Sequence, residues 1–227
     1  MRLRRIPTTL SGGGAGSPLE PAGMLRGNES IAAAIANSSQ DYRTLRLAPD
    51  MWHVSGTITI ADDNVTITGS GLGTVIQLQR GTKAALMNVT GSNVLIENIS
   101  FVTESGTGVS PEYAIYVTGN DCTIRNCTFD GFYRTVLASG NLRMAVTNNR
   151  FKSQAASPVI DLNNTDYSVI SGNIIETNAT GNEIELDASC QYNTVFGNVA
   201  VGGAISISTS GGQANKYAAN SPAATPT

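Results

Sequence analysis

The sequence has 227 residues, of which 41% are hydrophobic and only 14% are charged, and its formal net charge is −3. This composition supplies enough apolar residues for a sizeable core and excludes disorder driven by net charge. No run of about eighteen apolar residues occurs, so no membrane-spanning helix is predicted. The 24 glycines, together with frequent Asn, Ser and Thr, favour an all-β chain with many turns.

The sequence has few histidine and cysteine side chains that could bind a metal or act in nucleophilic catalysis. The cysteines are Cys122, Cys127 and Cys190, and the single histidine is His53. An odd number of cysteines without histidine partners predicts neither a disulfide framework nor a zinc site. A Ser-His-Asp or Cys-His mechanism would depend on His53 alone, and a lone histidine is more often structural. We therefore expect no metal and no cofactor.

Residues 1–27 are predicted to form an extended, basic arm that precedes the folded body. They contain four arginines, among them Arg2, Arg4 and Arg5, and one glutamate, a net charge of +3 that leaves −6 for the rest of the chain. The segment is rich in Gly, Pro and Ser and has no apolar periodicity, so it cannot build a core by itself. Because no apolar stretch follows its basic start, secretion by a signal peptide is not expected.

The next segment, residues 28–38, is predicted to be a short helix that covers the first coil of the body. An asparagine at its start is a suitable N-cap, and Ile31 and Ile35 fall on one helical face. Residues 44–60 are predicted to form the first coil. At the opposite end of the chain, residues 221–227 are predicted to be a loose polar tail.

Between these ends the sequence repeats an eight-residue motif at intervals of 22 to 29 residues. Six copies are evident, and a weaker seventh lies near Asn215–Asn220. The six copies span residues 65–72, 94–101, 122–129, 144–151, 168–175 and 193–200. Each interval has room for about three short strands, which is the pattern of a parallel β-solenoid of about seven coils over residues 28–220.

Three positions of the motif predict how the coils stack. The third position is always Ile or Val, and the eighth runs from Leu72 through three phenylalanines to Ala200, so both are predicted to point inward. The fifth position holds only Asn or Gly, which adopt a left-handed backbone conformation at least cost. Its members are Gly69, Asn98, Asn126, Asn148, Gly172 and Gly197. We expect a bend there in each coil, with Asn side chains that hydrogen-bond along the stack.

A second register, in the strand that precedes each motif copy, predicts an outward-facing row. Its members are Asn88, Tyr116, Ala138, Asp161, Glu185 and Ser206. Asp161 and Glu185 would stack about 5 Å apart on neighbouring coils. Retaining glycosidases hold a carboxylic acid and a carboxylate at a similar separation. Tyr116, two coils away from this pair, is a candidate for stacking on a sugar, and Asp187 is a further candidate glycan contact.

Other interpretations of these residues remain open. The two carboxylates also suit the solvated face of an acidic protein, or they could hold Ca²⁺ together with Asp187 and backbone carbonyls. Aromatic residues make up only 6% of the chain, which is few for a groove that cuts glycans. The glycine-rich segment 69–73 is not a phosphate-binding loop, because the residues after it predict a strand rather than a helix. The acidic body disfavours nucleic-acid binding.

Several motifs together carry a family resemblance that covers about residues 28–220. They are Leu-x-Leu-x-Pro at Leu45–Pro49, Asn-Val-Thr-Ile-x-Gly-x-Gly at Asn64–Gly71, and Asn-x-x-Ile-x-Asn-x-x-Phe at Asn93–Phe101. With the Ala-rich helix, they resemble the pectate-lyase-like superfamily, most closely its phage tailspike and virion-protein branch. That family usually continues the first strand with Pro-Gly-x-Tyr, whereas this chain has Pro49-Asp-Met-Trp52. The resemblance implies a right-handed parallel β-helix, often trimeric in phages, that serves as a lyase, a hydrolase or an inert scaffold.

From this resemblance we expect a structural virion protein of a bacteriophage, a capsid decoration or tailspike-like component made in the host cytoplasm. Its arm, through Arg2, Arg4 and Arg5, is expected to anchor it to capsid or tail proteins. Its body is expected to form a homotrimer and to touch host surface polysaccharide. The alternative is a polysaccharide-degrading tailspike, a glycoside hydrolase or lyase, that uses Asp161 and Glu185.

Overall fold

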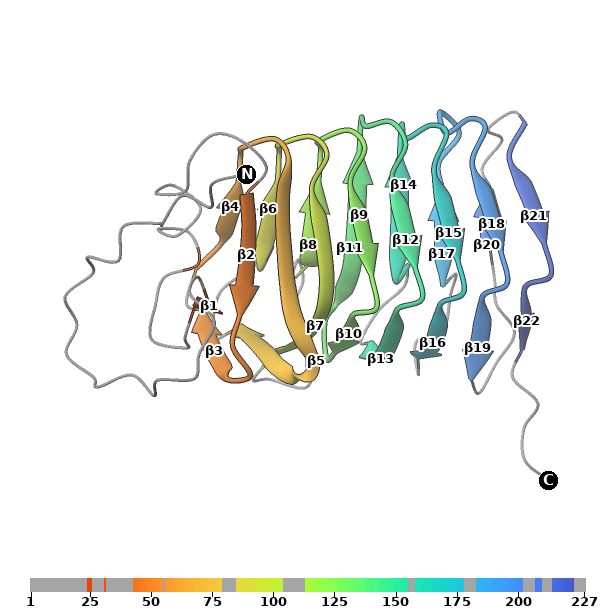
Figure 1. The fold of residues 1–227 in the computed structure, drawn as a ribbon. Helices are drawn as coiled ribbons and strands as arrows, with labels where there is room; N and C mark the ends of the chain where they lie inside the picture. Colours follow the sequence, from red (N-terminus) through yellow and green to blue (C-terminus); the bar gives the residue numbers. More distant parts are fainter. Residues whose placement is uncertain are drawn as a thin grey trace, which may run out of the picture.

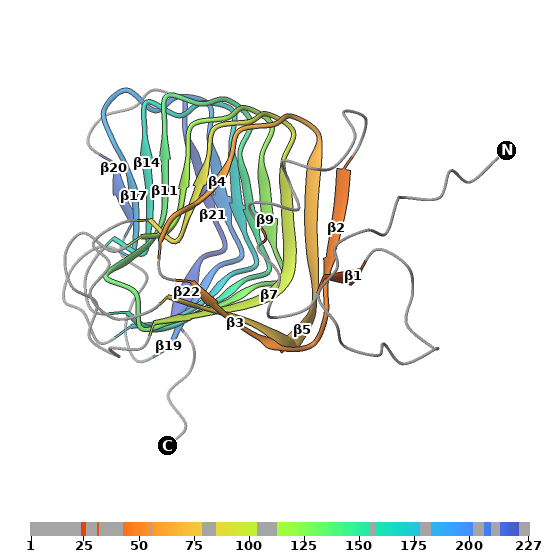
Figure 2. The ribbon, with the colours of Figure 1, turned by 90° about the vertical axis from the view of Figure 1, so that its left-hand side faces the viewer.

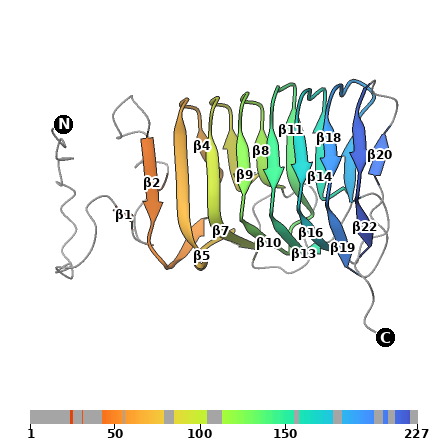
Figure 3. The same cartoon turned by 45° about the vertical axis from the view of Figure 1, so that its right-hand side comes forward.

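The computed structural model describes residues 24–25, 31, 43–54, 56–78, 85–103, 113–154, 158–177, 183–201, 207–209 and 214–222. Over these residues the chain winds into a parallel β-solenoid of about six turns (Figure 1). The predicted all-β solenoid is therefore confirmed, with about six turns over the described residues where the repeat predicts about seven coils. Its coils follow one another in chain order from the N-terminal to the C-terminal end (Figure 3). None of the described residues belongs to a helix long and apolar enough to span a bilayer.

Strands on three faces surround the core (Figure 2). The first face contains β2 (Arg43–Leu47), β9 (Thr123–Arg125), β12 (Ala145–Thr147), β15 (Val169–Ser171), β18 (Thr194–Phe196) and β21 (Lys216–Ala218). The second contains β3 (Met51–Val54), β10 (Thr128–Asp130), β13 (Arg150–Gln154), β16 (Ile174–Thr177), β19 (Val199–Val201) and β22 (Ser221–Pro222). The long strands β5 (Val65–Leu78) and β7 (Leu95–Thr103) bend through both faces and join them into one sheet of 15 strands.

The third face is a separate seven-stranded sheet. It consists of β4 (Ile58–Ile60), β6 (Met87–Val89), β8 (Tyr113–Val117), β11 (Arg134–Ser139), β14 (Ile160–Asn163), β17 (Ile184–Leu186) and β20 (Ile207–Thr209). Each strand between the two ends, β4 and β20, pairs with the equivalent strands of the coils before and after it, so the third face is continuous.

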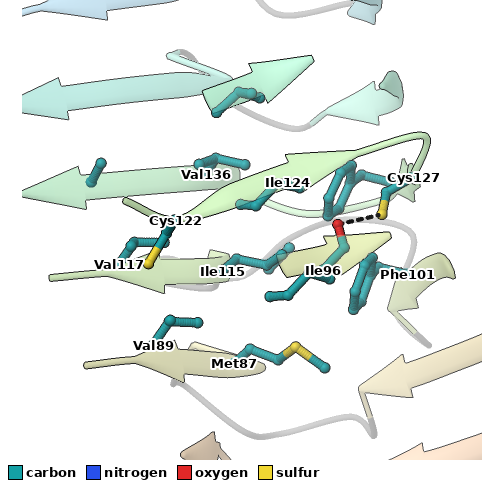
Figure 4. Packing of buried hydrophobic residues seen from close by; sticks show 14 of the residues in the cluster. Met87, Val89, Ile96, Phe101, Ile115, Val117, Cys122, Ile124, Cys127 and Val136 are labelled. Carbon is teal, nitrogen blue, oxygen red and sulfur yellow. Dashed lines mark hydrogen bonds between the residues drawn. The ribbon is translucent and has the colours of Figure 1, made fainter. Parts of the chain in front are cut away.

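The core is built from columns of identical or similar side chains, as the repeat predicts. The rings of Phe101 and Phe129 stack at 5.0 Å between centroids, and those of Phe129 and Phe151 at 5.1 Å. Figure 4 shows apolar side chains of the first and third faces meeting between the sheets, with the Cys127 thiol donating a hydrogen bond to the Ile96 carbonyl. Burial of these apolar columns is the main stabilising contribution to the solenoid.

Leu72 does not belong to the inward column in which the sequence analysis placed it. Its side chain is 75% exposed, and Ile76 pairs with Phe101 in its place. The register of β5 against β7 shifts on both sides of Gly71, so the first bend is longer than the later ones. The motif copy at residues 65–72 therefore has additional residues before its last inward position.

The left-handed bends occur at five of the six positions predicted for them. Positive φ angles between 54° and 65° are found at Asn98, Asn126, Asn148, Gly172 and Gly197. Gly69 is the exception, since the positive φ of the first bend is at Gly71. Gly69 is instead required by a close approach, because a Cβ atom there would lie 2.5 Å from the carbonyl oxygen of Asn98.

The hydrogen-bonded asparagine ladder lies at the sixth motif position and not, as expected, at the fifth. Asn149, Asn173, Asn198 and Asn220 stack there on consecutive coils. Each side-chain oxygen accepts a hydrogen bond from the backbone NH of the preceding rung, beginning with Cys127 at 2.9 Å. The fifth position supplies the bend, and the sixth position turns its side chain inward to satisfy the backbone at the bend.

The two ends differ from the predicted boundaries. Met24–Leu25 form β1, which pairs with Arg46 and Leu47 of β2, so part of the predicted arm extends the sheet. Ser221–Pro222, predicted as tail, form β22 and pair with β19. Of the predicted helix over 28–38, only Ile31 is among the described residues, where it is helical and buried. Arg2, Arg4 and Arg5 lie outside the described residues.

Candidate functional site

The outer surface of the third face presents one row of side chains in register, which we call the outer row. Its members are Asn88, Tyr116, Leu137, Asp161 and Glu185, and the backbone of Ser208 continues the same register on β20. The predicted row had Ala138 in place of Leu137 and ended at Ser206. Ala138 points inward, fully buried between Val117 and Leu162, and Ser206 lies outside the described residues. Leu137 and Ala138 are both apolar, so residue type alone does not show which of them faces the core. The predicted inward–outward alternation is therefore one residue out of register in this strand.

Asp161 and Glu185 are brought together as predicted. They are direct partners on β14 and β17, and neighbouring parallel strands lie about 4.8 Å apart. Their environments differ. Glu185 is half-buried, whereas Asp161 is only 5% exposed. The two carboxylates are therefore an unequal pair, of which one reaches solvent.

Arg134 completes this pair and was not recognised in the sequence. Its Nη1 donates a hydrogen bond of 3.1 Å to Oδ2 of Asp161, from the start of β11 on the preceding coil. Burial raises the pKa of Asp161 to about 6, since it outweighs the opposite effect of the Arg134 charge, and the Glu185 carboxylate raises it further. Arg134 lies outside the repeated motif, so no periodic signal marks it.

Two buried polar atoms near the outer row have no hydrogen-bond partner within the described part of the chain. They are Oδ1 of Asn88 and Nε of Arg134. Buried polar atoms are nearly always paired with protein or water, so each of these two positions suits an ordered water molecule.

Asp187 has a structural role at the end of β17. Its Oδ1 accepts hydrogen bonds from the Asn164 backbone NH at 3.1 Å, and from the backbone NH and hydroxyl of Ser189 at 3.0 and 2.6 Å. Burial acts to raise its pKa, but these hydrogen bonds prevail and hold the pKa of Asp187 below its usual value. The carboxylate is thus engaged in closing the turn.

The described residues do not assemble the calcium site that the sequence left open. Within the ranges that the structure describes, no three His, Cys, Asp or Glu side chains come close enough to hold a metal ion. The row contributes a half-exposed aromatic ring at Tyr116, an apolar side chain at Leu137 and the carboxylate of Glu185. A flat surface with these three kinds of group suits an extended ligand with hydroxyl groups and apolar CH faces.

Comparison with known proteins identifies the fold. Residues 53–221 match the family model described as "Right handed beta helix region". No curated protein sequence matches the chain.

Solved structures of carbohydrate-active enzymes resemble the chain. A pectin methylesterase in complex with a hexasaccharide is 13% identical, with a TM-score of 0.56 over 80% of this chain and 63% of that one. The catalytic domain of a GH87 alpha-1,3-glucanase in complex with nigerose is 18% identical, with a TM-score of 0.63 over 84% and 39%. The pectin methylesterase from Aspergillus niger is 16% identical, with a TM-score of 0.60 over 91% and 88%. The chain thus spans less than two thirds of the first two, and at these identities the likeness concerns the fold alone.

Proposed function

Because the chain belongs to the right-handed β-helix family, we propose that it is a structural β-helix of a bacteriophage particle that binds host surface polysaccharide along the outer row. The binding proposal rests on one observation, the in-register row that brings the ring of Tyr116, the apolar side chain of Leu137 and the carboxylate of Glu185 onto one outer surface. Two structural neighbours were solved with saccharides bound, which supports a saccharide as ligand for this fold. The particle location rests on the resemblance of the coil motifs to the tailspike and virion-protein branch.

A binding role is favoured over hydrolysis by the state of Asp161. Retaining hydrolysis needs two carboxyl groups that both reach the sugar. Asp161 is almost completely buried and ion-paired with Arg134, so only Glu185 is available to a ligand. Hydrolysis by the Asp161–Glu185 pair is the second candidate, favoured by the raised pKa of Asp161, which suits a general acid near neutral pH.

The proposal assigns attachment to the arm and self-association to the body. Residues 1–27, with Arg2, Arg4 and Arg5, carry positive charge that would dock on capsid or tail proteins while the acidic body projects away. A homotrimer, which the family resemblance implies, would pack short rods side by side. Multi-angle light scattering on the soluble protein measures this directly, and a stable monomer at micromolar concentration would contradict the trimer.

The experiment that tests the function compares binding with cleavage. Purified surface polysaccharides of candidate hosts are immobilised, and retention of the wild-type chain is measured together with the release of reducing ends. We expect retention without release, and at least a tenfold loss of retention in Tyr116→Ala. Release that disappears in Glu185→Gln would instead establish the hydrolase. If no polysaccharide retains the protein, the binding proposal is wrong.

A further inference from the structure

A second column of left-handed residues runs along the corner between the third face and the first face. Its members are Asn64, Asn93, Asp121, Arg143, Tyr167, Tyr192 and Ala214, with φ between 56° and 59°. Each of them shortly precedes a strand of the first face, on successive coils. We call this column the turn ridge. Each member directly precedes a copy of the repeated motif, so the repeat places them in one column, and the structure shows which of them interact.

The side chains of the turn ridge interact in consecutive pairs. The Asn93 amide donates a hydrogen bond of 2.8 Å to Oδ1 of Asn64. Arg143 forms an ion pair with Asp121 at 2.5 Å. The rings of Tyr167 and Tyr192 stack at 5.0 Å between centroids, with their planes 8° apart.

Burial does not account for the tyrosine pair. Tyr167 is 55% exposed and Tyr192 is 50% exposed. Both adopt a left-handed conformation that is unfavourable for a bulky residue, by about 1–2 kcal/mol each, and for which Asn or Asp would be cheaper. A ring pair contributes only about 0.5–1.5 kcal/mol in return. The corner imposes the left-handed conformation on every coil, so what distinguishes these two coils is the presence of two exposed aromatic rings there.

Among the described ridge residues, only Tyr167 stacks on Tyr192, whose side chain is 50% exposed. Because the stack follows the ridge, we expect the second ring face of Tyr192 to be on the side of the next coil. The ridge residue of that coil is Ala214, whose methyl group is too short to continue the stack. Beside this position, Thr194 and Lys216 are partners on β18 and β21, with the Lys216 side chain exposed. We call the surface position marked by Tyr192, Ala214, Thr194 and Lys216 the ridge slot.

We propose that the ridge slot binds one pyranose ring of a saccharide, as a site separate from the outer row. The apolar CH face of the sugar would stack on Tyr192 in the place that a third ring would take. Its hydroxyl groups would accept from the Lys216 ammonium and exchange hydrogen bonds with the Thr194 hydroxyl. The inference shares its ligand class with the proposed function but none of its residues.

The decisive variant is Ala214→Tyr, which fills the slot and leaves Tyr192 in place. Tyrosine is already accommodated at this ridge position in two preceding coils, so the variant is expected to fold with an unchanged or higher melting temperature. Tyr192→Ala removes the stacking face. Arg143→Ala, on the other side of the tyrosine pair, is the matched control, because it changes the ridge without touching the slot.

Binding is measured by saturation-transfer NMR on the full chain, with methyl α-D-glucopyranoside, methyl α-D-galactopyranoside and methyl α-L-rhamnopyranoside as probes, and AMP as a planar anionic competitor. We expect at least one glycoside to bind wild type and Arg143→Ala equally, with at least a tenfold weaker signal in Ala214→Tyr and Tyr192→Ala. Any of three results would overturn the proposal. They are a glycoside signal that Ala214→Tyr does not weaken, the absence of any glycoside signal, and a signal from AMP alone that depends on the slot. Glu185→Gln, in the outer row, should leave slot binding intact, so failure of the proposed function is distinguished from failure of this one.

Discussion

Asn149 and Asn173 lie on consecutive coils, and Oδ1 of Asn173 accepts hydrogen bonds from both the backbone NH and the side-chain NH₂ of Asn149, at 3.0 and 3.1 Å. Both residues are buried. The side-chain NH₂ of Asn173 in turn donates to the Val146 carbonyl at 2.9 Å. The Asn173 amide thus satisfies two backbone groups of the preceding coil, so the bends of neighbouring coils depend on each other.

We predict that Asn173→Ala lowers the free energy of unfolding by about 2–4 kcal/mol, because it leaves buried NH and carbonyl groups without partners. Urea denaturation followed by circular dichroism measures the loss. Gln191→Ala, at an exposed position of the adjacent coil, is the control and should change stability by less than about 0.5 kcal/mol. Equal effects of the two substitutions would show that the ladder is not stabilising.

The stacked phenylalanines give a second prediction. Phe129 is fully buried between Phe101 and Phe151, so Phe129→Ala should destabilise the chain by about 3–5 kcal/mol through the cavity that it leaves. Phe196, on the outer surface of β18, is 44% exposed, and Phe196→Ala should cost much less. Thermal melts of both variants test this, and comparable losses would argue against the continuous aromatic column.

The close approach of Gly119 to the preceding coil gives a third prediction. A Cβ atom at Gly119 would lie 1.8 Å from the carbonyl oxygen of Gly91, which belongs to the backbone of the preceding coil. Gly119→Ala must push the coils apart and should cost at least about 2 kcal/mol. Gly56→Ala is the matched control, since nothing lies within 4 Å of its Cβ position. Similar melting temperatures for the two variants would contradict the coil contact.

The buried carboxyl predicts a particular dependence of stability on pH. The pKa of Asp161 is raised from 3.8 to about 6, chiefly by burial, so the folded chain holds this proton more tightly than the unfolded chain does. Its contribution to stability is therefore greatest below pH 3.8 and falls as the pH rises through about 6. Asp161→Asn removes this dependence. Between pH 4 and pH 7.5 the variant should gain stability relative to wild type, on the order of 2 kcal/mol. A stability difference that stays constant over this range would refute the burial of the carboxyl.

The fifth prediction concerns deletion of the arm, and the structure decides where the deletion has to end. Because Met24–Leu25 pair with β2, a deletion that tests anchoring has to end before them. Deletion of residues 1–22 should leave the melting temperature unchanged and abolish incorporation into the particle. Incorporation at full occupancy would show that the docking surface lies on the β-helix instead.

Much of the fold follows from the sequence because a solenoid repeats its local pattern in each coil. Inward side chains recur at fixed motif positions, and Asn or Gly recurs where the backbone turns left-handed, so the periodicity predicts both the columns and the bends. The adjacency of Asp161 and Glu185 follows in the same way. Side chains on the same strand position of consecutive coils must stack, whatever their chemistry.

Tertiary structure decided the features that do not repeat. The register shift around Gly71 exposes Leu72, and the alternation in β11 turns Leu137 outward and Ala138 inward. Neither follows from residue type, because alanine and leucine are compatible with both surfaces. Tyr167 and Tyr192 directly precede two copies of the motif, so the repeat makes them neighbours, but only the structure shows that their rings stack. The contact of Arg134 with Asp161 joins different strand positions on neighbouring coils, outside the motif. Only the winding of the chain brings such residues together, since no local preference of either residue specifies its partner.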